Sequence, residues 1–186
     1  MRSAGFVLTG GESSRMGRDK AMLSWRSRPL VESVVEAVKS AARNVTLIGA
    51  PERYAHLGHR VLADLRPGMG PLGGIHTALK TQSGELNLIV ACDMPGLSGT
   101  LLTNLLRAAT QNNALCTVTR DGGGGIHPLC AVYRTECLSF IEDALKERRL
   151  RLLDLVRDLR AVSMYWDGNV SNVNTPVEWE RWQQHD

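Results

Sequence analysis

Two glycines and two cations stand together near the N-terminus in a pattern that suits phosphate chemistry. The segment FVLTGGESSRMGRDKAML runs from an apolar stretch into Gly10 and Gly11, and then carries Arg15 and Lys20. Glycines let a backbone approach a ligand closely, and successive backbone N–H groups bind anions. Arginine holds two phosphate oxygens at once, whereas lysine acts as a compact point charge. The segment therefore predicts a phosphate-binding loop; a glycine-rich turn with two solvated cations is the competing interpretation.

The spacing of this loop differs from both of the best-known phosphate loops. Neither a G-x-x-x-x-G-K-[ST] string nor a G-x-G-x-x-G string can be aligned with it. His56 and His59 lie three residues apart, but no third ligand nearby supports a zinc site. No serine, cysteine or histidine lies in a recognisable nucleophile motif. Covalent catalysis is therefore not predicted.

A carboxylate follows the most apolar run of the chain. In LIVACDMP, Asp93 ends this run, and Pro95 stops its continuation. Mg²⁺ prefers one or two protein carboxylates together with phosphate oxygens and water. Asp93 is therefore a candidate magnesium ligand, and an aspartate that caps a helix or a turn is the alternative.

A second glycine-rich segment, DLRPGMGPLGGI, starts at Asp64. Its four glycines expose backbone donors and acceptors, which suits recognition of the flat edge of a nucleobase. The alternative is a flexible loop followed by Pro71 near the start of a helix.

The segment SNVNTPVEWERW combines a helix start with two unexplained amides. Thr175 and Glu178 form a capping box around Pro176, so helix capping accounts for both of them. Asn172 and Asn174 alternate in sequence and are expected to face the same side of an extended segment. We expect either ligand contacts or support of a turn. Two tryptophans farther along the same helix predict a hydrophobic seal: Trp179 and Trp182.

Strand-like and helix-like patterns alternate along the chain. Short apolar runs predict strands at Gly5–Leu8, Val45–Ile48, Val61–Ala63, Leu86–Cys92, Leu115–Thr119 and Leu129–Tyr133. Apolar residues at helical spacing predict helices over 31–38, 72–79, 101–109, 138–145 and 152–159. This alternation predicts an α/β fold, a mostly parallel, Rossmann-like sheet with helices on both faces in three layers. The direction of Leu129–Tyr133 stays open between parallel and antiparallel.

Polar residues follow several predicted strands at the edge where α/β proteins bind ligands. Thr9, Asp64 and Asp93 each stand at the end of an apolar run, so we expect them to converge on one crevice. His127 follows the Gly122–Gly125 loop, expected to be a mobile loop tip, and is predicted to border the crevice.

Length and composition set limits on the class of protein. A chain of 186 residues suits a single domain, residues 1–186. A formal net charge of +3 is too small to indicate nucleic-acid or membrane binding, and no apolar run is long enough for a signal peptide or a membrane span. The four cysteines form no C-x-x-C pair, which favours reduced core residues in a cytoplasmic protein.

The motifs LTGGESSRMGRDKAML, GPLGGI, CDMP, HPL and NVNTP occur in the order found in the molybdenum cofactor guanylyltransferases, and the chain resembles this family from Phe6 to about Trp182. The first motif is common to nucleotidyltransferases, whereas GPLGG resembles the guanine-reading loop. Two departures are Thr9 in place of the usual alanine and Gly73 in place of the alanine of GPLAG. The resemblance implies one nucleotidyltransferase domain with the nucleotide-diphospho-sugar transferase type of fold.

The resemblance also implies an activity. Magnesium-bound GTP would donate GMP to the terminal phosphate of molybdopterin, releasing pyrophosphate. Arg15 and Lys20 would neutralise phosphate charge and Asp93 would hold Mg²⁺, the expected cofactor. The residues expected around the two substrates are Leu8, Thr9, Gly10, Gly11 and Asp64 for the nucleotide, the backbone around Pro71 and Leu72 for guanine, and Asn172 and Asn174 for the second substrate.

Two other interpretations stay open. One is a nucleotidyltransferase that uses CTP or another phosphorylated acceptor. The other is a nucleotide-binding subunit without activity, although the presence of Arg15, Lys20 and Asp93 together argues against it. Transient contact with proteins of cofactor biosynthesis or with molybdoenzymes is compatible with either.

Overall fold

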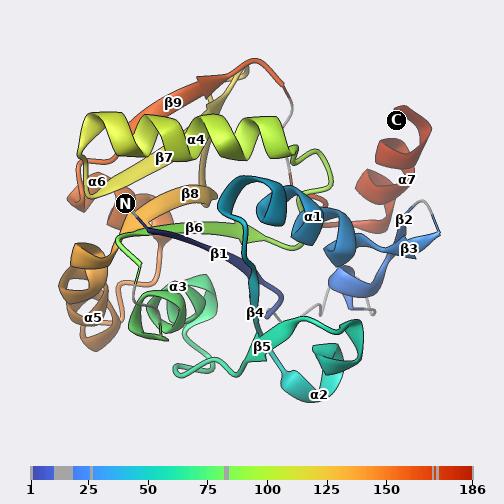
Figure 1. Cartoon of the computed structure of the whole chain (residues 1–186), viewed down its shortest axis with the longest axis horizontal. Coiled ribbons are helices and arrows are strands. Elements are labelled where there is room, and N and C mark those ends of the chain that lie inside the picture. Colours follow the sequence, from blue (N-terminus) through green and yellow to red (C-terminus); the bar gives the residue numbers. More distant parts are fainter. Residues whose placement is uncertain are drawn as a thin grey trace.

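A seven-stranded sheet forms the centre of the protein (Figure 1). The computed structural model describes residues 2–10, 19–25, 27–81, 84–168, 170 and 172–185. The strand order is β5-β4-β1-β6-β8-β7-β9, with the bounds Arg60–Leu62, Thr46–Ile48, Ser3–Leu8, Leu86–Ala91, Ile126–Arg134, Cys116–Asp121 and Val162–Trp166.

The sheet is parallel except around one strand. β1 pairs in parallel with β4 and β6, β4 with β5, and β7 with β9. β8 runs antiparallel to both of its neighbours, β6 and β7. The mostly parallel sheet is therefore confirmed, and the open direction of the run at 129–133 is antiparallel.

Helices cover both faces of this sheet, as expected (Figure 1). α1 (Leu30–Ala42) and α4 (Gly99–Asn112) share one core cluster with Val7, Leu88 and Val90 of the sheet. α3 (Gly70–Thr81), α5 (Leu138–Lys146) and α6 (Leu152–Asp158) share the other cluster with Phe6 and Ile89. Successive residues of a strand point to opposite faces, so continuous apolar runs supply both cores.

Several short elements complete the chain. They are the hairpin strands β2 (Ser24–Trp25) and β3 (Arg28–Pro29), the helices α2 (Pro51–Tyr54) and α7 (Pro176–His185), and the 3₁₀ turns η1 (Lys20–Met22), η2 (Ala55–Leu57) and η3 (Thr135–Cys137). α7 lies beside the hairpin (Figure 1) because Trp25 packs edge-on against Trp179 and Trp182, with ring centroids 5.7 and 4.7 Å apart. The expected hydrophobic seal is confirmed.

The cysteines, the lengths of the helices and the Gly122–Gly125 segment were also subjects of sequence expectations. All four cysteines are free and buried. Among the described residues, every helix is too short or too polar to cross a membrane. Gly122–Gly125 forms the turn between β7 and β8, where the Asp121 carboxylate accepts a hydrogen bond from the N–H of Gly125 at 2.8 Å.

Candidate active site

The ends of β1 and β6 meet at a central cavity of about 280 Å³. Their parallel pairing places Leu8 beside Ala91, so the residues that follow, Thr9 and Asp93, come together. We expected all three polar strand ends in one crevice; Thr9 and Asp93 line the central cavity, and Asp64 lines a neighbouring cavity. The expected site residues that line the central cavity are Leu8, Thr9, Gly10, Lys20, Pro71, Asp93, Asn172 and Asn174.

Four polar side chains form a connected network in the central cavity. Lys20 Nζ lies 3.3 Å from Asp93 Oδ2 and donates a hydrogen bond to Asn174 Oδ1 at 2.9 Å. Asn172 Nδ2 donates to Asp93 Oδ1 at 3.0 Å. Between the two asparagines, Val173 is buried and its N–H donates to the Asp93 carbonyl oxygen at 2.9 Å. Both amides therefore face the cavity, as their alternation predicted.

Asp93 is a carboxylate in a poorly solvated position. Its side chain is 15% exposed. Burial raises the pKa of the Asp93 carboxyl above its usual range, and the ammonium of Lys20 opposes part of this rise. The ionised carboxylate therefore gains from any further cation that enters the central cavity.

Lys20 is positioned by contacts that the sequence motif did not show. Asp19 precedes it, and Asp19 Oδ1 accepts a hydrogen bond from the N–H of Ala21 at 3.0 Å, which caps η1. The other oxygen, Oδ2, accepts from the Tyr54 hydroxyl of α2 at 2.7 Å. Tyr54 thus connects the lysine turn to a helix 30 residues farther along the chain, and no local sequence signal indicates this contact.

A large cavity of about 900 Å³ lies next to the central one. The end of β1 and residues 48–53 form one wall, and Asp64 with the glycine-rich segment forms the other. Gly68 and Gly70 have positive φ values of 78° and 59°, which let this segment turn into α3. Gly68, Gly70 and Gly74 line the cavity without side chains, so the wall exposes backbone at this point.

The resemblance places the backbone around Pro71 and Leu72 at the guanine site, whereas the side chain of Leu72 belongs to the core. Its side chain is fully buried in the core under α3 and does not line the large cavity, whereas its neighbour Pro71 does. α3 begins at Gly70, so residues 72, 75 and 79 form the face of the helix that packs on the sheet.

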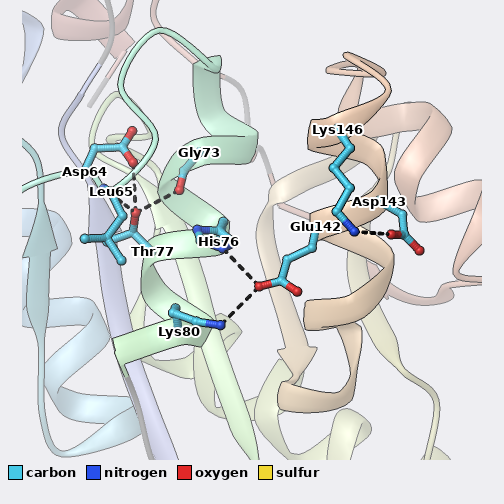
Figure 2. Close-up of polar contacts among 9 residues, drawn as sticks. All are labelled: Asp64, Leu65, Gly73, His76, Thr77, Lys80, Glu142, Asp143 and Lys146. Carbon is cyan, nitrogen blue, oxygen red and sulfur yellow. Dashed lines mark hydrogen bonds and ion pairs between the residues drawn. The ribbon is translucent and has the colours of Figure 1, made fainter.

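Asp64 is fixed by hydrogen bonds at one of its two oxygens (Figure 2). Asp64 Oδ1 accepts from the Thr77 hydroxyl at 2.8 Å and from the N–H of Arg66 at 2.9 Å. On the far side of α3, the Glu142 carboxylate of α5 contacts Lys80 at 3.2 Å and the buried ring of His76 at 3.5 Å. α3 is therefore held from two sides, and Thr77 is a further residue that sequence analysis missed.

An outer cavity of about 380 Å³ opens on the other side of the central one. Its basic side chains are those of His127 and Arg151, and His127 does border the crevice, as predicted. The His127 ring, 2.6 Å from Asp121 Oδ2, holds the pKa of the Asp121 carboxyl below its usual range. Leu129 and Asn172 line both the outer and the central cavity.

The three cavities form one groove across the strand ends. Leu8, Gly10 and Pro71 belong to both the large and the central cavity, so the network around Asp93 lies between the large and outer cavities. Gly11 and Arg15, two of the predicted phosphate contacts, lie outside the described residues. Within the described ranges, no group of three or more histidine, cysteine or acidic residues is placed to hold a metal ion.

In open α/β sheets, ligands bind in the crevice at the carboxyl ends of the strands, which is where this groove lies. Residues 5–162 match the family of the MobA-like NTP transferase domain. A molybdenum cofactor guanylyltransferase of Xanthomonas euvesicatoria is 35% identical over 185 residues, which cover 95% of this chain and 92% of that protein. The chain thus belongs to the MobA-like NTP transferase family, that of the molybdenum cofactor guanylyltransferases, and is a nucleotidyltransferase.

Solved structures agree with the fold. The molybdopterin-guanine dinucleotide biosynthesis protein A of Archaeoglobus fulgidus superimposes with a TM-score of 0.81 at 22% identity over 97% of each chain. Rv0371c of Mycobacterium tuberculosis, solved as a manganese complex, superimposes with a TM-score of 0.75 at 16% identity over the full length of both chains. These similarities confirm the nucleotide-diphospho-sugar transferase type of architecture.

Proposed function

We propose that this enzyme transfers GMP from magnesium-bound GTP to the terminal phosphate of molybdopterin, which yields a guanine dinucleotide cofactor and pyrophosphate. One observation carries the proposal: the Lys20–Asp93 pair lies at the junction of the large and outer cavities. A transferase for two substrates needs such a junction, because its reacting atoms must meet there. The names of the relatives support the identity of the two substrates.

The groove suggests how the substrates are arranged. The guanosine occupies the large cavity, with its base against the backbone wall that begins at Asp64. The triphosphate then reaches Lys20 in the central cavity. A phosphate oxygen of the acceptor attacks the α-phosphorus, the new P–O bond forms, and the bond to the bridging oxygen breaks as pyrophosphate leaves. Lys20, with Arg15 by resemblance, offsets the negative charge that gathers on the transferring phosphate.

The chemistry of the central cavity fits a bound divalent cation. In the structure, the Lys20 ammonium lies between the Asp93 carboxylate and the amide oxygen of Asn174. These are the oxygen ligands that Mg²⁺ prefers, and triphosphate oxygens would complete the set. When bound, Mg²⁺ would supply Lewis-acid stabilisation of phosphate charge. Asp93 is the residue proposed to hold it, while Lys20 moves onto the phosphates.

The second substrate is proposed to lie in the outer cavity. Asn172 lines both this cavity and the central one, and Asn174 contacts Lys20. The two asparagines are therefore proposed to bind the acceptor near its phosphate. His127 and Arg151 add positive or hydrogen-bonding groups for an anionic acceptor. The four buried, reduced cysteines suit the reducing cytoplasm, where we propose that the enzyme works.

Release of pyrophosphate tests this function directly. The purified enzyme with Mg²⁺ and molybdopterin should release pyrophosphate with GTP and should release far less with CTP. A control without molybdopterin measures hydrolysis of the nucleotide alone. Equal or greater release with CTP would assign a cytidylyltransferase, and no release with either nucleotide would favour a nucleotide-binding subunit.

A further inference from the structure

Thr77 carries a buried hydroxyl beside the wall of the large cavity (Figure 2). The residue is 0% exposed. Its oxygen accepts a hydrogen bond from the N–H of Leu65 at 2.9 Å, and it lies 2.8 Å from Asp64 Oδ1 and 2.9 Å from the carbonyl oxygen of Gly73. A hydroxyl has one proton to donate, and the charged carboxylate is the stronger acceptor. The hydroxyl therefore joins α3 to both Asp64 and the residue after it.

These contacts leave the two oxygens of Asp64 with different hydrogen bonding. Both hydrogen bonds to this carboxylate from the described residues fall on Oδ1, from Thr77 and from the N–H of Arg66. Asp64 lines the large cavity. The other oxygen, Oδ2, is thus the one free to accept a hydrogen bond from a ligand in that cavity.

Gly73 allows this arrangement by its lack of a side chain. A Cβ atom at position 73 would lie 2.5 Å from the carbonyl oxygen of Arg66 and 3.0 Å from Asp64 Oδ2. The first distance is too short for any real contact, so an alanine would force residues 64–66 away from α3. Glycine at this position lets residues 64–66 pack against α3 closely enough for Thr77 to form its hydrogen bonds.

We propose that Thr77 is a positioning residue for base selection, which holds Asp64 Oδ1 so that Oδ2 accepts a hydrogen bond from the N–H edge of guanine. This inference rests on the proposed function. Guanine presents donors at N1 and at its 2-amino group, whereas adenine presents an acceptor at N1 and no amino group at C2. An ionised carboxylate can only accept, so a fixed Oδ2 favours guanine and leaves adenine unpaired.

The test compares three variants by titration of GTP, ATP and dGTP in the presence of Mg²⁺. Thr77→Val keeps the shape of the side chain and removes the hydroxyl, and Thr77→Ser keeps the hydroxyl. Thr81→Val is the matched control, because the hydrogen bonds of the Thr81 hydroxyl to described residues stay within α3, to the carbonyl oxygens of Thr77 and Ala78. Melting temperatures measured alongside establish that each variant is folded.

The expected result is a selective loss. Thr77→Val should reduce the preference for GTP over ATP by about tenfold, the scale for one mispositioned hydrogen bond to a charged group. Thr77→Ser and Thr81→Val should keep the wild-type preference. dGTP should follow GTP in every variant. Asp64→Asn retains Thr77 and the acceptor oxygen that Thr77 and Arg66 hold, and replaces Oδ2 by an amide donor. It should reduce the preference in the same direction and provides the second variant if Thr77→Val does not fold.

Two results would overturn the inference, and they differ from failure of the proposed function. A wild-type GTP-to-ATP ratio in both Thr77→Val and Asp64→Asn would show that Asp64 Oδ2 does not select the base. A wild-type preference for GTP over dGTP that disappears in Thr77→Val would assign Oδ2 to the ribose hydroxyl instead of the base. If the wild-type enzyme itself does not prefer GTP, the proposed function fails before any variant is compared.

Discussion

The large and outer cavities lie on opposite sides of Asp93, and they are built differently. The wall of the large cavity is backbone held by buried groups, as at Thr77, which is 0% exposed. The outer cavity includes Ile126 and Leu153, which are 42% and 46% exposed. A preformed wall suits discrimination between bases of similar shape, whereas an open apolar surface suits a larger flat ligand. The comparison suggests that selectivity is stricter for the nucleotide than for the acceptor.

The largest effect is expected for Asp93 in the central cavity, between the large and outer cavities. Asp93→Asn keeps the size of the side chain and removes its charge, so transfer should fall by about 10³-fold, near the upper end for loss of one charged group. Added Mg²⁺ should recover part of the rate. Because burial disfavours the ionised form of Asp93, the neutral amide should not lower the melting temperature. If Asp93→Asn were fully active at low Mg²⁺, Asp93 would have a structural role in the turn and would not hold the metal ion.

Lys20→Ala should have the next largest effect. Loss of its ammonium should lower turnover by about 10²-fold, since one preorganised charge on the phosphates is removed. The Lys20 side chain is 18% exposed, and Asn172 still donates to Asp93 in the variant, so the melting temperature should stay near the wild-type value. Lys80→Ala is the matched control, because Lys80 lies on α3 with its ammonium paired to Glu142. Transfer at the wild-type rate in Lys20→Ala would contradict the proposed phosphate contact.

Substitution of Asn172 tests whether the two sides of the groove bind different substrates. Asn172→Ala removes a partly buried amide that lies between the central and outer cavities. Acceptor binding should weaken by about 1–3 kcal/mol, while GTP binding should hardly change. Asn174→Ala should act in the same direction by about 1 kcal/mol, because Asn174 is exposed. A loss of GTP affinity with unchanged acceptor affinity would show that these asparagines bind the nucleotide and not the acceptor. A loss of thermal stability with both affinities unchanged would show that they only support a turn.

Much of the fold could be predicted because buried strands leave continuous apolar runs. β9 was missed, since an edge strand with exposed Val162 and Tyr165 lacks such a run. The antiparallel direction of β8 could not be predicted, because an apolar run carries no information about direction.

The site was predictable where residues follow strand ends or lie in one local motif, as Asp93 and Lys20 do. Thr77 and Tyr54 act through contacts between distant segments, so no spacing indicates them. The stripe over 72–79 predicted the buried side chain of Leu72, because apolar residues at helical spacing mark the face of a helix that packs on the sheet. The expected contribution of Leu72 to the guanine site is through its backbone and stays a prediction.

The smallest effect is expected for Tyr54→Phe, which should change the kinetics for GTP and not those for the acceptor. Tyr54→Phe removes the hydroxyl that donates to Asp19 and leaves the ring, which is packed in the core, in place. The lysine turn should then be held less firmly, so kcat/KM for GTP should fall by about fivefold, equivalent to about 1 kcal/mol for one hydrogen bond. The KM for the acceptor should not change, because Tyr54 lies on the helix beside the large cavity. Steady-state kinetics with each substrate varied in turn measures both values. A change confined to the acceptor KM would mean that Tyr54 acts across the groove, and the division between a firmly built nucleotide side and a more open acceptor side would then be wrong.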